Sequence, residues 1–367
     1  MRIKKKWNSS LLFLVMSILL ASCSNRQVIN QIELVQTAGF DLDNKEVLSS
    51  ALIGEYNEKE KTSVKLLKAT SNNSYDMIQL LNLKSNYPIK YGQMRMMLFG
   101  EAYATHNIGP LLKYLAQDVS ISGNLNLAVS KNKASELLAA TIPTHDPLFL
   151  MKMIIQNSDT ANLPHTDLQT TLFNFFDEGR DMYLPLLSWD ANKKTLVEGI
   201  VLFKDDKDGK LILQKGNEEA LWLKMLVENS KNGTFMYPLD DANNENENFA
   251  LVQIMESKTN FTSKPVQADP RRIYALDINI NAKLQIKGGL PHTENNPLQN
   301  KLETYISGKM EHFIQSCLSA NIDPVGFGSF FRSKIRGWNA SEFYEVYPSM
   351  KTNVITKVQI VKAGIKK

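Results

Sequence analysis

The residue whose surroundings most clearly indicate a chemistry is Cys23. It follows Leu20, Ala21 and Ser22, at the end of an apolar run that begins at Leu11. Four basic residues precede the run: Arg2, Lys4, Lys5 and Lys6. A basic start, a short apolar run and small residues before a cysteine are typical of an exported lipoprotein precursor. The run is too short to cross roughly 30 Å of hydrocarbon as a permanent helix. We therefore predict cleavage between Ser22 and Cys23, and a diacylglyceryl thioether on the Cys23 sulfur.

The predicted processing changes the charge and the cysteine content of the chain. The formal net charge of +4 comes from the four basic residues of the signal, so the mature chain is neutral. A neutral chain has no bulk electrostatic reason to bind nucleic acid or anionic lipid. Two acyl chains are enough for stable anchoring. Cys317 is then the only remaining cysteine that could form a disulfide, so the fold must rest on core packing.

The other residues with chemical potential do not form a recognisable set. The five histidines show no helical metal-ligand spacing, and no cysteine pair accompanies them: His106, His145, His165, His292 and His312. The stretch from Asp206 to Gly209 resembles a calcium loop, but Lys204 and Lys215 would occupy ligand positions, which favours a hairpin turn. Neither a phosphate-binding loop nor a nucleophile elbow occurs. We therefore expect no catalytic residues, no metal site and no cofactor.

Periodicity indicates the elements that make up the fold. Residues 276–286 alternate between apolar and polar, which predicts a strand with one buried face. Residues 298–318 carry an apolar stripe that includes Cys317, which predicts a long helix and a buried thiol. Strands and helices alternate irregularly elsewhere, which favours a multi-domain α+β fold with largely antiparallel sheets over a doubly wound sheet. No later segment is apolar enough to be a membrane span.

The chain length predicts several domains after the signal. We place the signal peptide at residues 1–22, an N-terminal α+β domain at 23–190 and a C-terminal α+β region at 191–367. The C-terminal region divides again near 191–263 and 270–367.

A series of short segments, in order, carries a resemblance to a known family. They are Ala38–Asp41, Tyr91–Arg95, Gln117–Asp118, Glu198–Lys204 with Asp208–Leu211, Asp323–Gly328, Trp338 and Val354–Ile360. In this order and spacing the chain resembles the C-subunit lipoproteins of nutrient germinant receptors in spore-forming bacteria, the Ger(x)C family. It departs from the family pattern at Ser24-Asn25, where members usually have Trp-Asp, and at Gln117, where they have arginine.

The resemblance implies a non-enzymatic lipoprotein on the extracytoplasmic face of the cell or spore inner membrane. It also implies partners, namely integral membrane A- and B-type receptor subunits. Arg95 and Asp118 are then candidate charges of a partner interface, with a solvated or internally paired state as the alternative. Gly326, Phe327 and Gly328 are predicted to form a tight structural loop around a buried phenylalanine.

Two other classes of protein remain open from the sequence. A substrate-binding lipoprotein of a transporter would have two similar doubly wound lobes around a cleft. A lipid-anchored hydrolase would need a nucleophile or a metal site.

Overall fold

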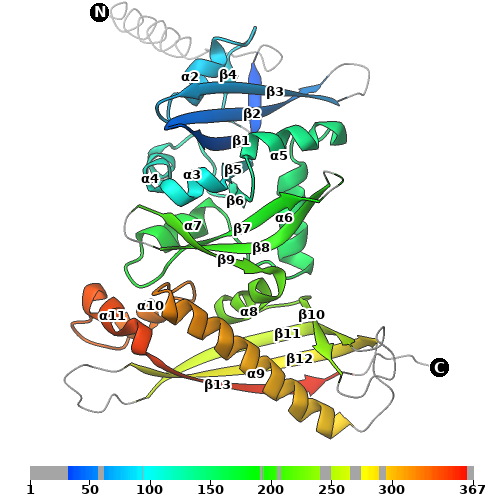
Figure 1. Cartoon of the computed structure of the whole chain (residues 1–367), viewed down its shortest axis with the longest axis vertical. Helices are drawn as coiled ribbons and strands as arrows, with labels where there is room; N and C mark the ends of the chain where they lie inside the picture. The colour runs from blue at the N-terminus through cyan, green and yellow to red at the C-terminus, as the bar shows by residue number, and fades with distance from the viewer. Residues whose placement is uncertain are drawn as a thin grey trace, which may run out of the picture.

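The fold consists of two β-sheets stacked along the long axis of the molecule (Figure 1). The computed structural model describes residues 32–56, 62–92, 94–190, 192, 194–204, 208–239, 249–264, 274–288 and 295–361. A nine-stranded sheet lies toward one end, and a four-stranded sheet lies at the other end. Helix α8 (Asn217–Val227) lies between them, because it contacts β8 and β9 of the large sheet and β10 and β11 of the small one.

The large sheet combines a parallel centre with antiparallel flanks. Its strands are β1 (Glu33–Asp43), β2 (Glu46–Tyr56), β3 (Thr62–Ser71), β4 (Ile89–Lys90), β5 (Met96–Gly100), β6 (Asn126–Ser130), β7 (Tyr183–Trp189), β8 (Thr195–Lys204) and β9 (Lys210–Gly216). The order is β3-β2-β1-β5-β6-β7-β8-β9, and β4 pairs with the start of β1. Strands β1, β5, β6 and β7 run parallel. Parallel strands are buried on both faces, so β5 and β6 show continuous burial rather than alternation.

Helices cover both faces of the large sheet. Helices α3 (Glu101–His106), α4 (Gly109–Gln117) and α7 (Leu168–Phe176) pack against one face, which includes Met97 and Phe99. Helices α5 (Ala134–Thr141) and α6 (Phe149–Thr160) pack against the other, which includes Met96 and Leu98. Helix α2 (Met77–Asn82) contacts β3 and β4 at the end of the molecule far from the small sheet (Figure 1).

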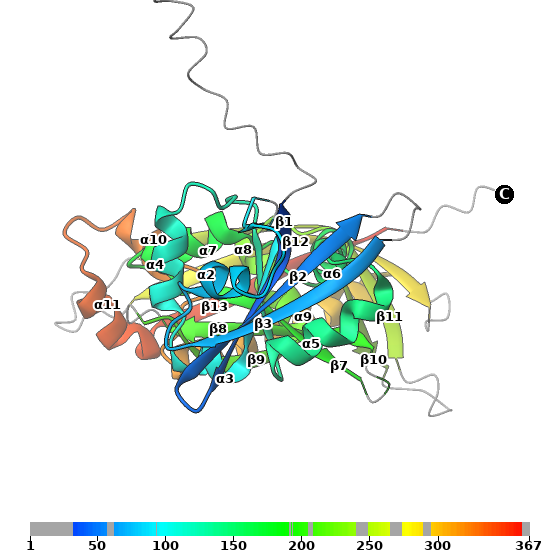
Figure 2. The ribbon, with the colours of Figure 1, turned by 90° about the horizontal axis from the view of Figure 1, so that it is seen from above.

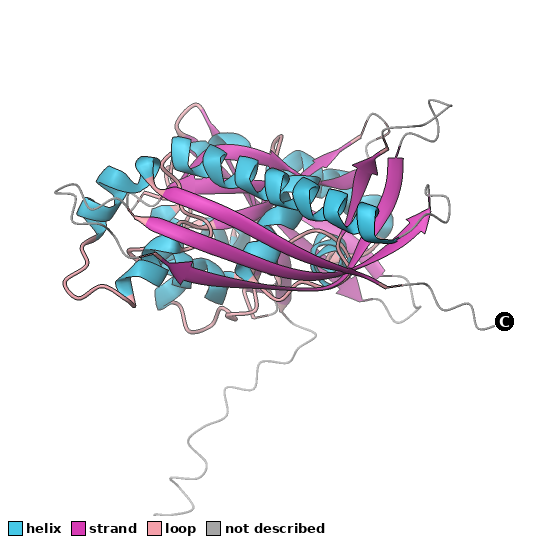
Figure 3. Ribbon diagram, turned by 90° about the horizontal axis from the view of Figure 1, so that it is seen from below, coloured by secondary structure: helices cyan, strands magenta, loops and turns pink. Residues whose placement is uncertain are grey.

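The small sheet has one helix-covered face and one uncovered face. It runs β10 (Thr234–Pro238), β11 (Phe249–Ser263), β12 (Ala275–Gly288) and β13 (Lys351–Ile360). The long helix α9 (Asn295–Ser319) packs across one face, and in the described part of the chain no helix lies on the other (Figure 3). Helices α10 (Phe327–Arg332) and α11 (Ala340–Val346) join α9 to β13.

Several predictions from the sequence are confirmed. The strand expected at 276–286 lies within β12, and the helix expected at 298–318 lies within α9. The α+β class is confirmed, and no helix in the described part of the chain is long and apolar enough to cross a membrane. The predicted turn near Asp206 lies partly outside the described residues, but Gly209 has the positive φ of +62° that such a turn uses.

The domain boundary at residue 190 stays a prediction. The large sheet continues across this position, because β7 pairs with β8 from Tyr183–Leu202 to Trp189–Thr195.

Candidate functional site

The topology creates a groove at the carboxyl ends of the parallel strands. After β5 the chain turns into α3 on one face of the sheet, and after β6 it turns into α5 on the opposite face. Where the connections from neighbouring parallel strands diverge in this way, a crevice opens outside the strand ends, and open α/β sheets commonly bind ligands there.

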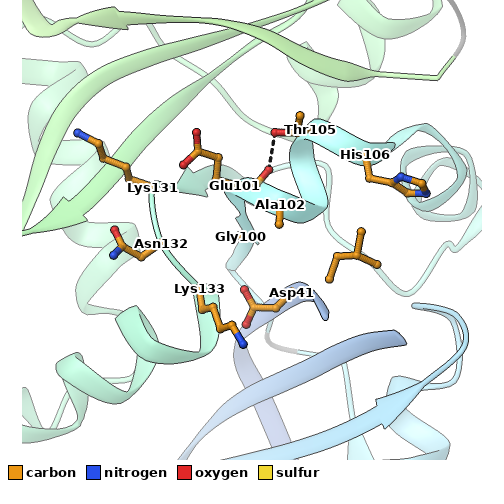
Figure 4. A pocket seen from close by; sticks show the side chains of 10 residues that line it. Asp41, Gly100, Glu101, Ala102, Thr105, His106, Lys131, Asn132 and Lys133 are labelled. Atoms are coloured by element: carbon orange, nitrogen blue, oxygen red, sulfur yellow. Dashed lines mark hydrogen bonds between the residues drawn. The ribbon is translucent and has the colours of Figure 1, made fainter. Parts of the chain in front are cut away.

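The groove has a volume of about 700 Å³, and most of the residues that line it have polar side chains (Figure 4). Ten residues line it: Asp41, Leu42, Gly100, Glu101, Ala102, Thr105, His106, Lys131, Asn132 and Lys133. They come from the end of β1 and from the segments that follow β5 and β6. The groove therefore unites three segments that are far apart in the sequence.

Asp41 has a structural task within the groove. Its side chain is 2 % exposed, and its carboxylate accepts the backbone N–H groups of Ala134 at 2.5 Å and Ser135 at 2.9 Å. These are the first residues of α5, so the carboxylate caps that helix and complements its dipole. A Cβ on Gly100 would lie 2.2 Å from Asp41 Oδ1. Glycine at position 100 therefore makes room for the cap.

The charged groups around the rim of the groove already have partners. Lys133 pairs with Asp43 at 3.0 Å, and the pKa of Lys133 is raised by this contact. Lys131 pairs with Glu198 of β8 at 2.9 Å. The Glu101 carboxylate accepts the Gln214 amide at 2.5 Å. These contacts brace the loops that follow the strands. The groove can hold a small polar ligand, but its lining lacks a nucleophile hydrogen-bonded to a base.

A second constellation joins the middle of the chain to its C-terminal region. Both oxygens of the Asp323 carboxylate accept backbone N–H groups at the start of α10, those of Gly326 and Gly328, at 2.8 Å each. The Asp323 N–H donates to the Asp181 carboxylate at 2.5 Å, and the Asp181 N–H donates to the Asp323 carbonyl at 2.8 Å. Asp323 is fully buried, and desolvation raises the pKa of its carboxyl to about 6.

We call this constellation the seam, defined as residues 177–181 together with 323–332. Ser329 donates its N–H to the Gly179 carbonyl at 2.8 Å, and its hydroxyl donates to Asp177. The Gly179 and Gly328 backbones are in direct contact, since a Cβ on Gly328 would lie 2.9 Å from Gly179 Cα. The seam therefore locks the loop before β7 against helix α10.

The three residues predicted as a structural loop lie in the seam, but only Gly326 is in a loop, because Phe327 and Gly328 already belong to α10. Gly326 has a φ of +85°, a conformation that favours glycine, and it precedes α10. Phe327 is buried and packs edge-on against Phe261 with ring centroids 5.6 Å apart.

The two candidate charges of a partner interface, Arg95 and Asp118, have different surroundings. The Arg95 side chain is exposed, while its backbone links β1 and β6 through Gln36 and Asn126. The Asp118 carboxylate accepts the hydroxyl of Ser120 at 2.6 Å, the N–H of Ser120 and the hydroxyl of Tyr114, and these bonds lower its pKa. Asp118 thus has the internal pairing that was the alternative. A partner role for either residue stays a prediction.

The remaining predicted residues divide between described and undescribed parts. Ser22 and Cys23 lie outside the described residues. Cys317 is buried as expected, and burial raises the pKa of its thiol to about 12. Among the described residues, no group of three or more His, Cys, Asp or Glu side chains has an arrangement that could hold a metal ion.

One cluster was missed by the sequence analysis. His165 lies between Asp159 and Glu228, with nitrogen–oxygen distances of 3.0 Å to each. Desolvation alone would lower the pKa of His165, but the hydrogen bonds to both carboxylates outweigh it and raise the pKa. Only Asp159 is near His165 in the sequence, so the sequence spacing did not indicate that His165 also contacts Glu228.

Two families of known proteins together match nearly the whole length of the chain. The family described as "Spore germination protein N-terminal domain" matches residues 25–188. The family described as "Spore germination B3/ GerAC like, C-terminal" matches residues 198–364.

Two individual proteins are similar to this chain. The spore germination protein GerQC of Bacillus cereus is 25 % identical over 375 residues, which cover 98 % of this chain and 99 % of the relative. The crystal structure of the GerBC protein matches with a TM-score of 0.54 and 12 % identity. That match covers 88 % of this chain and 96 % of the GerBC chain, and it shows a shared fold.

Proposed function

This chain belongs to the Ger(x)C family of spore germination proteins, and from that premise we propose that it is the lipid-anchored subunit of a nutrient germinant receptor. In this proposal Cys23 carries the diacylglyceryl group and holds the protein at the extracytoplasmic face of the cell or spore inner membrane. The subunit then acts by assembly with integral membrane A- and B-type subunits rather than by catalysis.

One observation carries the proposal. The family match begins at residue 25, two positions after Cys23, and continues to residue 364 with a short gap. The predicted lipoprotein signal would therefore directly precede the family region, and a neutral mature chain would need such an anchor to stay at a membrane.

The geometry of the groove supports an assembly role. Asp41 is committed to capping α5, and the ionic groups of the rim pair with one another or with β8 and β9. A site whose charges brace the fold is suited to binding or to mechanical coupling, not to acid–base chemistry.

The first experiment tests lipidation and function together. Radiolabelled palmitate should enter the wild-type protein and not Cys23→Ala. A deletion strain should lose germination in response to one class of nutrient, and the wild-type gene should restore it, whereas Cys23→Ala should restore it poorly. Equal labelling of both proteins would overturn the anchor.

The same strain separates the alternatives. Germination unchanged with every amino acid and sugar, combined with a defect in uptake, would instead indicate the transport lipoprotein. The fold has one large and one small sheet, not the two similar lobes that such a protein requires.

Co-purification tests the partners. Detergent extracts of spore membranes should yield the tagged subunit together with integral membrane subunits. Recovery of the lipoprotein alone from gently solubilised membranes would contradict assembly.

A further inference from the structure

The turn between α2 and β4 lies beside the point where the mature chain enters the fold. We call residues 83–88 the α2–β4 turn. The Glu33 N–H donates to the Pro88 carbonyl at 2.9 Å, and Glu33 pairs with Ile89 in β4. Figure 1 places α2 and β4 at the end of the molecule opposite the small sheet, and Figure 2 looks onto that end. The turn is therefore next to the first described strand after the predicted anchor.

The turn presents apolar side chains to solvent. Leu83 is 83 % exposed and Tyr87 is 49 % exposed, although α2 buries Met77 and Leu81 completely. Single exposed apolar residues are common on soluble proteins and need no explanation by themselves. Here a leucine and a tyrosine protrude from the same six-residue turn, and tyrosine is enriched where proteins meet membrane headgroups.

Lysines surround the turn. Lys84 belongs to it, Lys90 follows in β4, and Lys68 lies on β3, and all three are exposed. The Lys84 ammonium donates to the Lys68 carbonyl at 2.7 Å, which ties the turn to β3. Within the described part of the chain, none of these three ammonium groups has an ion-pair partner. By contrast, Lys65 on the same strand pairs with Glu33 at 2.9 Å. The neutral average of the mature chain thus conceals a local positive cluster.

Chain length limits how far this end can lie from the anchor. Ten positions separate Cys23 from Glu33. Even a fully extended segment of that length reaches only about 35 Å. A lipid on Cys23 would therefore keep the α2–β4 turn at high effective concentration near the bilayer surface.

We propose that the α2–β4 turn, with Lys68 and Lys90, docks on the anionic outer surface of the membrane. Leu83 and Tyr87 enter the headgroup region, and the three lysines face acidic phospholipid headgroups. The inference rests on the proposed lipid anchor and adds an orientation to it. The long axis of the molecule then points away from the membrane, with the uncovered face of the small sheet at its far end.

Cysteine labelling of the full mature lipoprotein tests this orientation. Lipid blocks Cys23, and Cys317 is buried, so a cysteine introduced by Leu83→Cys is the accessible thiol for a polarity-sensitive fluorophore. Lys357→Cys, exposed on the far sheet, is the matched control. In phosphatidylglycerol-containing vesicles the probe at position 83 should shift to the blue and lose intensity to a lipid-borne quencher. The probe at position 357 should do neither.

The possible outcomes distinguish a failure of the proposed membrane contact from a failure of the proposed lipid anchor. Protein that floats with the vesicles while both probes stay water-like overturns the membrane contact and leaves the anchor standing. Protein that fails to float counts against the anchor itself. Replacing Lys68, Lys84 and Lys90 by glutamine, or using vesicles of pure phosphatidylcholine, should weaken the shift and the quenching at position 83. Shielding of position 83 only when the integral subunits are present would show that a protein, not lipid, covers the turn and would overturn the proposal.

Discussion

Asp41 and Asp323 cap helices in the same way but join different parts of the molecule. Each is buried, and each uses both carboxylate oxygens to accept backbone N–H groups at a helix start, α5 for Asp41 and α10 for Asp323. Asp41 connects a strand of the large sheet to a helix on the same sheet. Asp323 lies in the seam, where the loop before β7 meets the C-terminal region.

Glycines make both caps possible, but they approach different atoms. Gly100 faces the side chain of Asp41, while Gly179 faces the backbone of Gly328 and Ser329. A side chain can rotate away from an added methyl group, whereas two backbones held by hydrogen bonds cannot. The comparison therefore indicates that the seam is less adaptable than the Asp41 cap. The two aspartates themselves both lie in segments of the family's sequence pattern, Ala38–Asp41 and Asp323–Gly328.

The largest expected effect comes from Gly179→Ala. The new Cβ would lie 2.4 Å from the Ser329 nitrogen and 2.6 Å from the Gly328 carbonyl carbon. Overpacking of this kind should lower the free energy of unfolding by about 3 kcal/mol or more. Urea denaturation of the lipid-free mature chain measures it.

A matched control is available in α9. A Cβ on Gly308 would meet nothing within 4 Å, so Gly308→Ala should raise the free energy of unfolding by about 0.5–1 kcal/mol. If Gly179→Ala is tolerated as well as Gly308→Ala, the seam is not the rigid junction described above.

The second prediction uses the pH dependence of Asp323. Its carboxyl has a pKa of about 6 in the folded chain, above the ordinary aspartate pKa of 3.8, so the folded state binds the proton more tightly. The resulting stabilisation is present below pH 4 and is lost as the pH rises through about 6. The change amounts to about 3 kcal/mol at most. Asp323→Asn removes the titrating group.

The difference in unfolding free energy between wild type and Asp323→Asn, measured from pH 4 to pH 7.5, tests the sign. Wild type should lose stability relative to the variant as the pH rises. Gly308→Ala changes no titrating group and should keep the wild-type profile. A difference that grows in the opposite direction would mean that the hydrogen bonds to the α10 start outweigh desolvation.

Periodic elements could be predicted from the sequence, and tertiary junctions could not. Strand β12 has one face on α9 and one in water, so its side chains alternate, and α9 has a continuous apolar stripe. Strands β5 and β6 are five residues long and buried throughout, so they carry no alternation that would indicate parallel pairing.

The candidate site could be predicted only in part, because the contacts that build it join residues far apart in the sequence. Gly326 and Gly328 indicated a tight loop, but nothing near them indicated that Gly179 packs against it. The groove also escaped prediction. Glu101 and Lys131 follow strands that meet only because β1, β5 and β6 are neighbours in the sheet.

The third prediction concerns the Asp41 cap, the more adaptable of the two helix caps. Gly100→Ala would place a Cβ 2.2 Å from Asp41 Oδ1, so the carboxylate must turn away from the start of α5. Loss of a helix cap costs about 0.5–2 kcal/mol. Amide hydrogen exchange should show the opening at Ala134 and Ser135, with the seam still protected. Loss of protection in the seam as well would show that the two caps are coupled.

The smallest effect is expected for the ion pair at the edge of the seam. Arg332 lies 2.6 Å from the Asp177 carboxylate; the Arg332 side chain is 45 % exposed, whereas that of Asp177 is 5 % exposed. Solvent reaches the guanidinium and screens the pair from that side, so Arg332→Ala should cost about 1 kcal/mol. Asp177 also accepts the Ser329 hydroxyl, so it is not left without a partner. A double-mutant cycle with Asp177→Ala isolates the coupling energy. A coupling above about 2 kcal/mol, beyond the usual range for exposed pairs, would mean that charge, more than the close glycine contact, holds the seam together.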